Sequence, residues 1–110
     1  MQAFDLSQLV AEHAQTGDLY LEFLRVPSLS AGLYRLPAGG RDPQVPHTED
    51  EVYYVVDGRG AIQVGNERRD VAPGTLIFVP AGVEHCFDAI TEDLTVVVFF
   101  APAERTPATP

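Results

Sequence analysis

From Leu19 to Ala101 the chain alternates between short apolar runs and turns made of glycine, proline and asparagine. Short runs rich in valine, isoleucine and aromatic residues, bounded by such turns, are typical of β-strands. We expect strands over 19–26, 29–36, 46–57, 61–64, 67–71, 75–79, 84–90 and 94–101, with turns at 58–60, 65–66 and 72–74. This many short strands in one small chain predict an all-β sandwich or barrel.

One short helix is expected before the strands, at about residues 5–15. Its apolar residues recur at helical spacing. Asp5 is placed to cap the first turn, with Gln8 three residues on, and Gly17 follows the last turn. His13 lies beside the apolar stripe, and we interpret it as a structural residue of this helix.

A chain of 110 residues is long enough for one domain with a single core. We place this domain at residues 1–101. Residues 102–110 carry three prolines and small polar side chains, and we expect them to form a flexible tail that takes no part in the chemistry.

The net charge of −9 limits the classes of partner. An acidic surface repels phosphate backbones, so nucleic acid is not an expected partner. The same field favours divalent cations, and it favours a neutral or singly charged small molecule over a heavily anionic one. No apolar run approaches the roughly 20 residues that span a bilayer, and the first residues lack a signal peptide pattern. Cys86 is the single cysteine, which fits a reducing compartment, so we expect a cytoplasmic protein without membrane contact.

Two histidines and one glutamate are the candidate metal ligands. His47 and Glu51 are four residues apart, so on one extended strand their side chains point to the same face. Imidazole nitrogen and carboxylate oxygen together are common ligands of transition metals. His85, in the second glycine- and proline-bounded stretch, is the best candidate for the third ligand.

Two of the expected strands are apolar on both faces. Residues 53–56 and 96–100 leave no polar side for solvent. The N-terminal helix is expected to cover part of the outer face, and a second copy of the chain the rest. We therefore expect a homodimer.

The two stretches together resemble the cupin family. The first motif of that family is a glycine, five residues, His-x-His, three or four residues, Glu, six residues and Gly, and here it spans 39–58 with Val45, His47 and Glu51 at the ligand places. The second is a glycine, five residues, Pro-x-Gly, two residues, His, three residues and Asn, and here it spans 74–89 with His85 in place and Ala89 at the asparagine. The resemblance implies a double-stranded β-helix, or jelly-roll barrel.

The resemblance also implies a site. His47, Glu51 and His85 would hold one divalent transition-metal ion, either zinc, iron, manganese, nickel or copper, and the first motif histidine is replaced by Val45. Because histidine ligands must be neutral, occupancy is expected to weaken as pH falls below about 6. The expected pocket residues are Val45, Tyr53, Val55 and Phe87.

Two further residues are candidates for catalysis. Glu49 shares the parity of His47 and Glu51, so it either points inward as a base or lies solvated at the mouth beside Asp50. Tyr53 either donates a proton or packs as a core aromatic. The expected function is a metal-dependent enzyme acting on a small organic molecule by dioxygenase, isomerase or lyase chemistry. The alternatives are a small-molecule or metal sensor without turnover, and a structural barrel without an ion.

Overall fold

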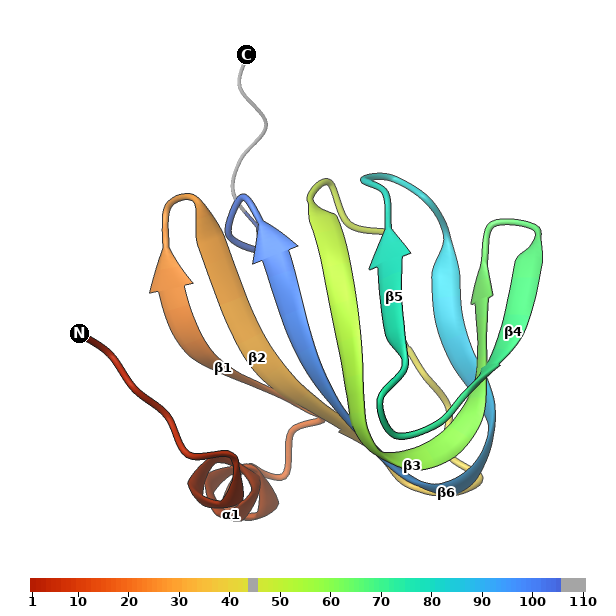
Figure 1. Ribbon diagram of the computed structural model, residues 1–110, viewed down its shortest axis with the longest axis horizontal. Coiled ribbons are helices and arrows are strands. Elements are labelled where there is room, and N and C mark those ends of the chain that lie inside the picture. Colours follow the sequence, from red (N-terminus) through yellow and green to blue (C-terminus); the bar gives the residue numbers. More distant parts are fainter. Residues whose placement is uncertain (44–45, 106–110) are drawn as a thin grey trace.

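The computed structural model describes residues 1–43 and 46–105 (Figure 1). One helix, α1 (Leu6–Thr16), precedes six strands. The strands are β1 (Tyr20–Val26), β2 (Leu29–Leu36), β3 (Asp50–Val64), β4 (Glu67–Val71), β5 (Leu76–Val79) and β6 (His85–Ala101). The expected all-β fold with one short N-terminal helix is confirmed. No helix in the described part of the chain combines the length and apolar character needed to span a membrane.

All six strands belong to one antiparallel sheet in the order β1-β2-β6-β3-β4, and β5 pairs with the first half of β3. The sheet is strongly curved, so that β1 and β2 form one wall and β4 and β5 the other (Figure 1). The long strands β3 and β6 pair along almost their whole length, from Asp50 opposite Ala101 to Val64 opposite His85. These two strands form the bent central part of the sheet.

The expected turn at residues 58–60 is wrong, because β3 continues through it. The register of β3 against β6 shifts three times between Val55 and Ala61, and such bulges bend a strand without ending it. Gly58 makes the bend possible: its φ is +92°, and a Cβ there would collide with the backbone carbonyl of Asp93. The expected break in β6 between residues 90 and 94 is absent for the same reason.

Local signals elsewhere predicted the structure well. Gly65 and Asn66 form the β3–β4 hairpin turn, with Val64 opposite Glu67. Gly17 ends α1 in the left-handed conformation, with φ of 75°. Asp5 occupies the N-cap position, but its side chain makes no capping hydrogen bond, so the expected capping box does not form. His13 is buried, and its Nε2 lies 2.7 Å from the carbonyl oxygen of Leu19, which ties the helix to the start of β1.

The core lies inside the curved sheet. It is built from alternate residues of β2, β3 and β6 together with Val71 and Val79, and its fully buried members include Tyr53, Val55, Phe87, Leu94 and Val96. The rings of Tyr53 and Phe87 pack edge to face with centroids 4.8 Å apart. A cavity borders this core, and Tyr34, Val98 and Phe100 belong both to the core and to the cavity wall.

Candidate metal centre

His47, Glu51 and His85 converge from separate parts of the barrel. Glu51 is the second residue of β3 and His85 the first of β6. His47 lies in the segment before β3, so the expectation that His47 and Glu51 share one strand is wrong. Each nevertheless offers a ligand atom, and the three atoms lie within 4.8 Å of one another. Such a group has the spacing that one metal ion needs.

Two hydrogen bonds donated by backbone amides join the segments that carry the histidines. The amide of Gly82 donates to the carbonyl oxygen of His47 at 2.7 Å. The amide of Ala81 donates to Oδ1 of Asp50 at 2.9 Å. The turn before β6 is therefore fixed to His47 and to the start of β3, which helps to set the separation of the two imidazoles.

Asp42 is a further positioning residue of the site. Its Oδ1 accepts a hydrogen bond from the Tyr34 hydroxyl at 2.5 Å, and its Oδ2 accepts one from the Phe87 amide at 2.8 Å. One carboxylate thus connects β2, β6 and the segment that leads to His47. Sequence analysis missed Asp42, because a carboxylate between Arg41 and Pro43 in a polar loop is ordinarily solvated.

Glu51 and His85 form a buried pair with an unusual hydrogen-bond deficit. Nε2 of His85 lies 2.9 Å from Oε1 of Glu51, and about 1% of each side chain is exposed. The distance is that of an ion pair, but within residues 1–43 and 46–105 neither Nε2 nor either carboxylate oxygen has a hydrogen-bond partner of acceptable geometry. Nδ1 of His85 is 2.9 Å from the carbonyl oxygen of Val83. Since a carbonyl only accepts, Nδ1 carries the proton, and in the neutral ring Nε2 is an acceptor facing another acceptor.

This pairing changes the protonation of His85. Burial of the ring lowers its pKa, but the Glu51 carboxylate and the Val83 carbonyl together outweigh burial, so the pKa is raised above the ordinary histidine value. A positive charge between Nε2 and Oε1 is what the geometry favours. A proton on His85 supplies it in part, and a metal ion supplies it to all three residues at once.

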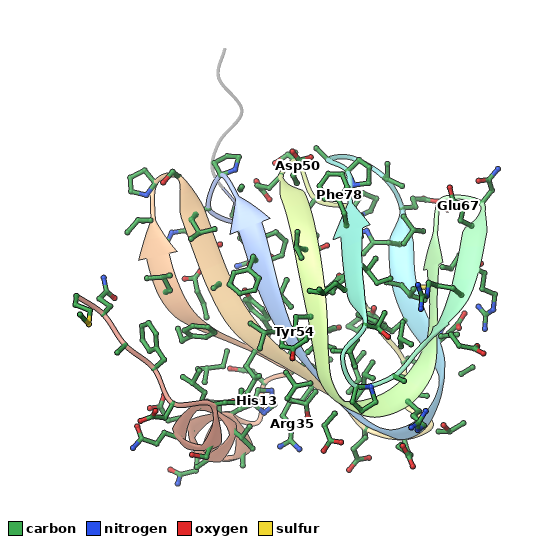
Figure 2. All side chains as sticks on the ribbon, in the orientation of Figure 1. His13, Arg35, Asp50, Tyr54, Glu67 and Phe78 are labelled. Atoms are coloured by element: carbon green, nitrogen blue, oxygen red, sulfur yellow. The ribbon has the colours of Figure 1, made fainter. Side chains whose placement is uncertain are left out.

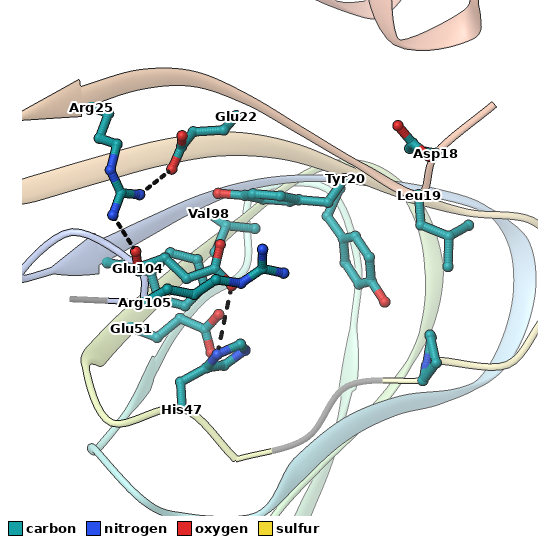
Figure 3. Close-up of a pocket in the computed structure, with 13 residues that line it drawn as sticks. Asp18, Leu19, Tyr20, Glu22, Arg25, His47, Glu51, Val98, Glu104 and Arg105 are labelled. Carbon is teal, nitrogen blue, oxygen red and sulfur yellow. Dashed lines mark hydrogen bonds and ion pairs between the residues drawn. The ribbon is translucent and has the colours of Figure 1, made fainter. Parts of the chain in front are cut away.

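A cavity of about 580 Å³ opens beside this group (Figure 3). Its charged and polar lining residues are Asp18, Tyr20, Glu22, Arg25, Tyr34, His47, Glu51, Glu104 and Arg105, and its apolar wall includes Leu19, Val98 and Phe100. Phe100 packs edge to face on His47 with centroids 4.9 Å apart. Four carboxylates against two arginines leave an excess negative charge, which a divalent cation would neutralise.

The two tyrosines of the cavity differ in one respect. Burial raises the pKa of both, and the hydrogen bond to Asp42 raises that of Tyr34 further, so both remain phenols at neutral pH. The Tyr34 hydroxyl has its partner in Asp42, whereas the buried Tyr20 hydroxyl finds none in the described part of the chain. The Tyr20 ring lies directly over Gly32, where a Cβ would collide with it.

Residues 102–110 were expected to form a tail away from the site, but Glu104 and Arg105 border the cavity; residues 106–110 lie outside the described residues. Glu104 lines the cavity, and its Oε2 is 3.6 Å from Nδ1 of His47. Burial raises the pKa of Glu104, and His47 and Arg105 oppose part of this rise. The proline-rich composition could not predict that Glu104 borders the cavity, because the contacts that hold this segment are made by its backbone.

The other expected site residues lie elsewhere. Glu49 is 3% exposed, so the expectation that it is solvated at the mouth is wrong. Its Oε2 accepts a hydrogen bond from the Thr48 hydroxyl at 2.7 Å, and it belongs neither to the metal group nor to the cavity lining. Tyr53, Val55 and Phe87 are core residues behind the site and do not line the cavity. Val45 lies outside the described residues.

Comparisons with known proteins identify a matching family and several similar proteins. The family model described as Cupin domain matches residues 32–101. An uncharacterized protein of Streptomyces coelicolor is 54% identical over 104 residues, covering 94% of this chain and 99% of that protein. The crystal structure of TT1209 from Thermus thermophilus is similar with a TM-score of 0.75 at 26% identity, covering 94% of this chain and 99% of the other. KdgF from a Halomonas species gives a TM-score of 0.69 at 25% identity, covering 76% of each chain.

Proposed function

This chain belongs to the cupin family, and we propose that it is a metal-dependent cupin acting on a small organic molecule. One divalent transition-metal ion would be held by His47, Glu51 and His85. Two imidazoles and one carboxylate suit zinc, iron, manganese, nickel and copper. Three protein ligands leave coordination positions open for the small molecule.

The buried Glu51–His85 pair carries this proposal. A carboxylate removed from water is costly unless a cation or several donors compensate it. Among the described residues no donor forms a hydrogen bond with either oxygen of Glu51, and Nε2 of His85 is equally without a partner. A cation at the point where these atoms and His47 converge would satisfy all of them at once.

The cavity supports a ligand of modest size and low charge. Its volume of about 580 Å³ is within the range of small-molecule sites. With a divalent ion in place, the formal charges of its four carboxylates and two arginines cancel, which favours a neutral or singly charged molecule. Val98 and Phe100 offer an apolar wall, and Tyr20 offers a neutral hydroxyl as a hydrogen-bond donor.

A bound ion would act as a Lewis acid on an oxygen atom of the ligand. Dioxygenase, isomerase and lyase reactions all use such polarisation, and these are the reaction classes that we propose. The protein's own part is to orient the ligand between Phe100 and the tyrosines and to exclude water through the packed core behind His85. We assign no step to Glu49 or Tyr53, since neither lines the cavity.

Two successive experiments test the proposal: the first measures bound metal and the second measures turnover. Protein expressed with each metal in turn is analysed for bound metal, beside the variants His47→Ala and Glu51→Ala. About one equivalent in the wild-type protein and a loss in both variants is expected, whereas less than about 0.1 equivalent of every metal would overturn it. Aerobic incubation with catechols, thiols, β-diketones and sugars then follows oxygen uptake and products. Saturable ligand binding without turnover would assign the protein instead as a sensor or binding cupin.

We also propose that the protein is a homodimer. The outer face of the sheet carries exposed apolar side chains on neighbouring strands, with Leu76 65% and Phe78 59% exposed, together with Tyr54 and Phe99. The strand register joins them, because Tyr54 lies opposite Leu76 and Val52 lies opposite both Phe78 and Phe99. On the same face Leu33 is fully buried at the end where α1 contacts β2. A second copy would cover the part that the helix leaves open.

A further inference from the structure

Both histidines of the candidate metal centre have an oxygen atom close to Nδ1. For His85 this oxygen is the backbone carbonyl of Val83, at 2.9 Å. For His47 it is the side-chain Oε2 of Glu104, at 3.6 Å. An acceptor at Nδ1 fixes which ring nitrogen carries the proton, and it leaves Nε2 as the lone-pair donor toward an ion.

We propose that Glu104 is a positioning residue for the metal site: its carboxylate accepts a hydrogen bond from Nδ1–H of His47 and directs Nε2 of His47 toward the ion. This inference rests on the proposed metal site. The carboxylate is not itself one of the three ligands whose atoms converge in the described part of the chain. It acts through the imidazole, whose basicity a neighbouring negative charge increases.

The backbone of the C-terminal segment holds Glu104 in place independently of its side chain (Figure 3). The amide of Glu104 donates to Oγ of Ser30 at 2.8 Å, and Ser30 is fully buried. Nη2 of Arg25 donates to the carbonyl oxygen of Glu104 at 2.6 Å. The amide of Ala103 donates to the carbonyl oxygen of Pro27 at 3.3 Å. The segment is therefore anchored on the β1–β2 hairpin, and its side-chain carboxylate is left to face His47.

The distance of 3.6 Å is slightly longer than a direct hydrogen bond. The rings of Phe100 and His47 pack edge to face with centroids 4.9 Å apart, so Phe100 borders the imidazole on one side. In the proposed arrangement Nδ1 and Oε2 approach each other by about 0.4 Å or more to form the hydrogen bond. Glu104 thus places an acceptor near Nδ1 of His47, as the Val83 carbonyl does near Nδ1 of His85.

Glu22 provides a matched control. It lines the same cavity and carries the same charge, but its Oε1 pairs with Nη1 of Arg25 at 2.9 Å. Glu22→Gln removes one negative charge from the cavity without touching His47. Any general electrostatic effect on cation binding is therefore measured by Glu22→Gln and subtracted from the effect of Glu104→Gln.

Zinc affinity, measured by competition with a chromophoric chelator, tests the inference. Glu104→Ala is expected to weaken zinc binding at least about tenfold, since loss of an outer acceptor on a metal-bound histidine has effects of that order. Glu104→Gln is expected to lose less, because the amide oxygen still accepts, and Glu22→Gln less than about twofold. Equal affinities for Glu104→Ala and Glu22→Gln would overturn the role of Glu104 while leaving the metal site intact. Zinc binding by the wild-type protein no tighter than by His47→Ala would overturn both proposals.

The tautomer of His47 is a second readout that does not need the metal. Long-range ¹⁵N–¹H spectra of the metal-free protein, recorded where the ring is neutral, are expected to show the Nδ1–H form in the wild-type protein. A mixture of tautomers is expected in Glu104→Ala, with the thermal unfolding temperature changed little because the backbone anchors remain. An unchanged His47 signal in Glu104→Ala would show that the carboxylate does not position the ring.

Discussion

Glu51 and His85 belong to opposite ends of the longest strand pair, yet Nε2 of His85 lies 2.9 Å from Oε1 of Glu51. Glu51 is opposite Phe100 near the end of β6, and His85 is opposite Val64 at the end of β3. In a flat sheet residues so far apart along the ladder could not touch. Their contact inside the barrel follows from the bulges between Val55 and Ala61, which bend β3 and β6 together.

Replacing Glu51 by glutamine is expected to stabilise the metal-free protein and to abolish metal binding. Above the folded pKa of His85, where the ring is neutral, Nε2 and Oε1 are buried acceptors that face each other; the amide NH₂ of Glu51→Gln replaces one of them with a donor to Nε2. Relief of one such deficit is worth about 1–3 kcal/mol. Urea denaturation with chelator present gives the free energy of unfolding, and a destabilised metal-free variant would contradict this account of the pair.

Metal binding and metal-free stability are expected to respond oppositely to pH. The pKa of His85 is raised above its unfolded value of 6.5, so the stability that this group contributes is fully present below that pH and is lost as pH rises through the folded pKa. A metal ion must displace the proton, so metal affinity rises over the same window. Unfolding temperatures with and without zinc, measured from about pH 6 to about pH 9, should diverge as pH increases. A constant difference across this range would contradict the expectation.

The two tyrosines of the cavity are expected to respond to phenylalanine with opposite signs. Tyr20→Phe removes a buried hydroxyl that has no partner, so it should stabilise the protein by about 1 kcal/mol. Tyr34→Phe removes the donor to Asp42 and should destabilise the protein by about 1.5–3 kcal/mol, because the lost bond is to a charged group. Denaturant unfolding of both variants, without metal, gives the two differences. Equal signs would show that the hydroxyl of Tyr20 is satisfied in solution.

Substitution by alanine is expected to destabilise the protein far more at Gly58 than at Gly39, although both glycines have positive φ. A Cβ at Gly39 meets open space, so Gly39→Ala should cost only the conformational strain of about 1–2 kcal/mol. A Cβ at Gly58 meets the backbone of Asp93 and Leu94, so Gly58→Ala should cost at least about 3 kcal/mol and loosen the bend. Free energies of unfolding compare the two variants, and similar values would show that the bend tolerates a side chain.

A charged residue introduced on the outer face of the sheet is expected to dissociate the proposed dimer into monomers. Phe78→Glu introduces a carboxylate into the exposed apolar face, where burial in an interface would leave it without a partner. Light scattering coupled to size exclusion should give twice the chain mass for the wild-type protein and the chain mass for the variant. Glu67 on β4 is exposed and borders the same surface groove as Leu76 and Phe78; Glu67→Gln changes charge beside the face without placing a carboxylate in it, and it should leave the mass unchanged (Figure 2). A monomeric wild-type protein would exclude the dimer.

The sequence alone determined the elements whose signals are local. Apolar alternation predicted the strands, Gly65 and Asn66 predicted the hairpin, and Gly17 predicted the end of α1, because each depends on the conformational preferences of adjacent residues. The spacing of the two motifs also selected His47, Glu51 and His85 as a group that the barrel does bring within reach of one ion. These residues are recognisable from side-chain type and interval alone.

Only the tertiary structure decided the rest. The continuity of β3 through Gly58 depends on the strand that pairs with it, and local composition there indicated a turn. Asp42 and Glu104 are acids in polar or proline-rich segments, and their places are set by hydrogen bonds to residues 45 and 74 positions away in the chain. A sequence displays which side chains are available, whereas the curvature of the sheet determines which of them meet, because contacts between distant strands arise only from the register and bend of the whole barrel.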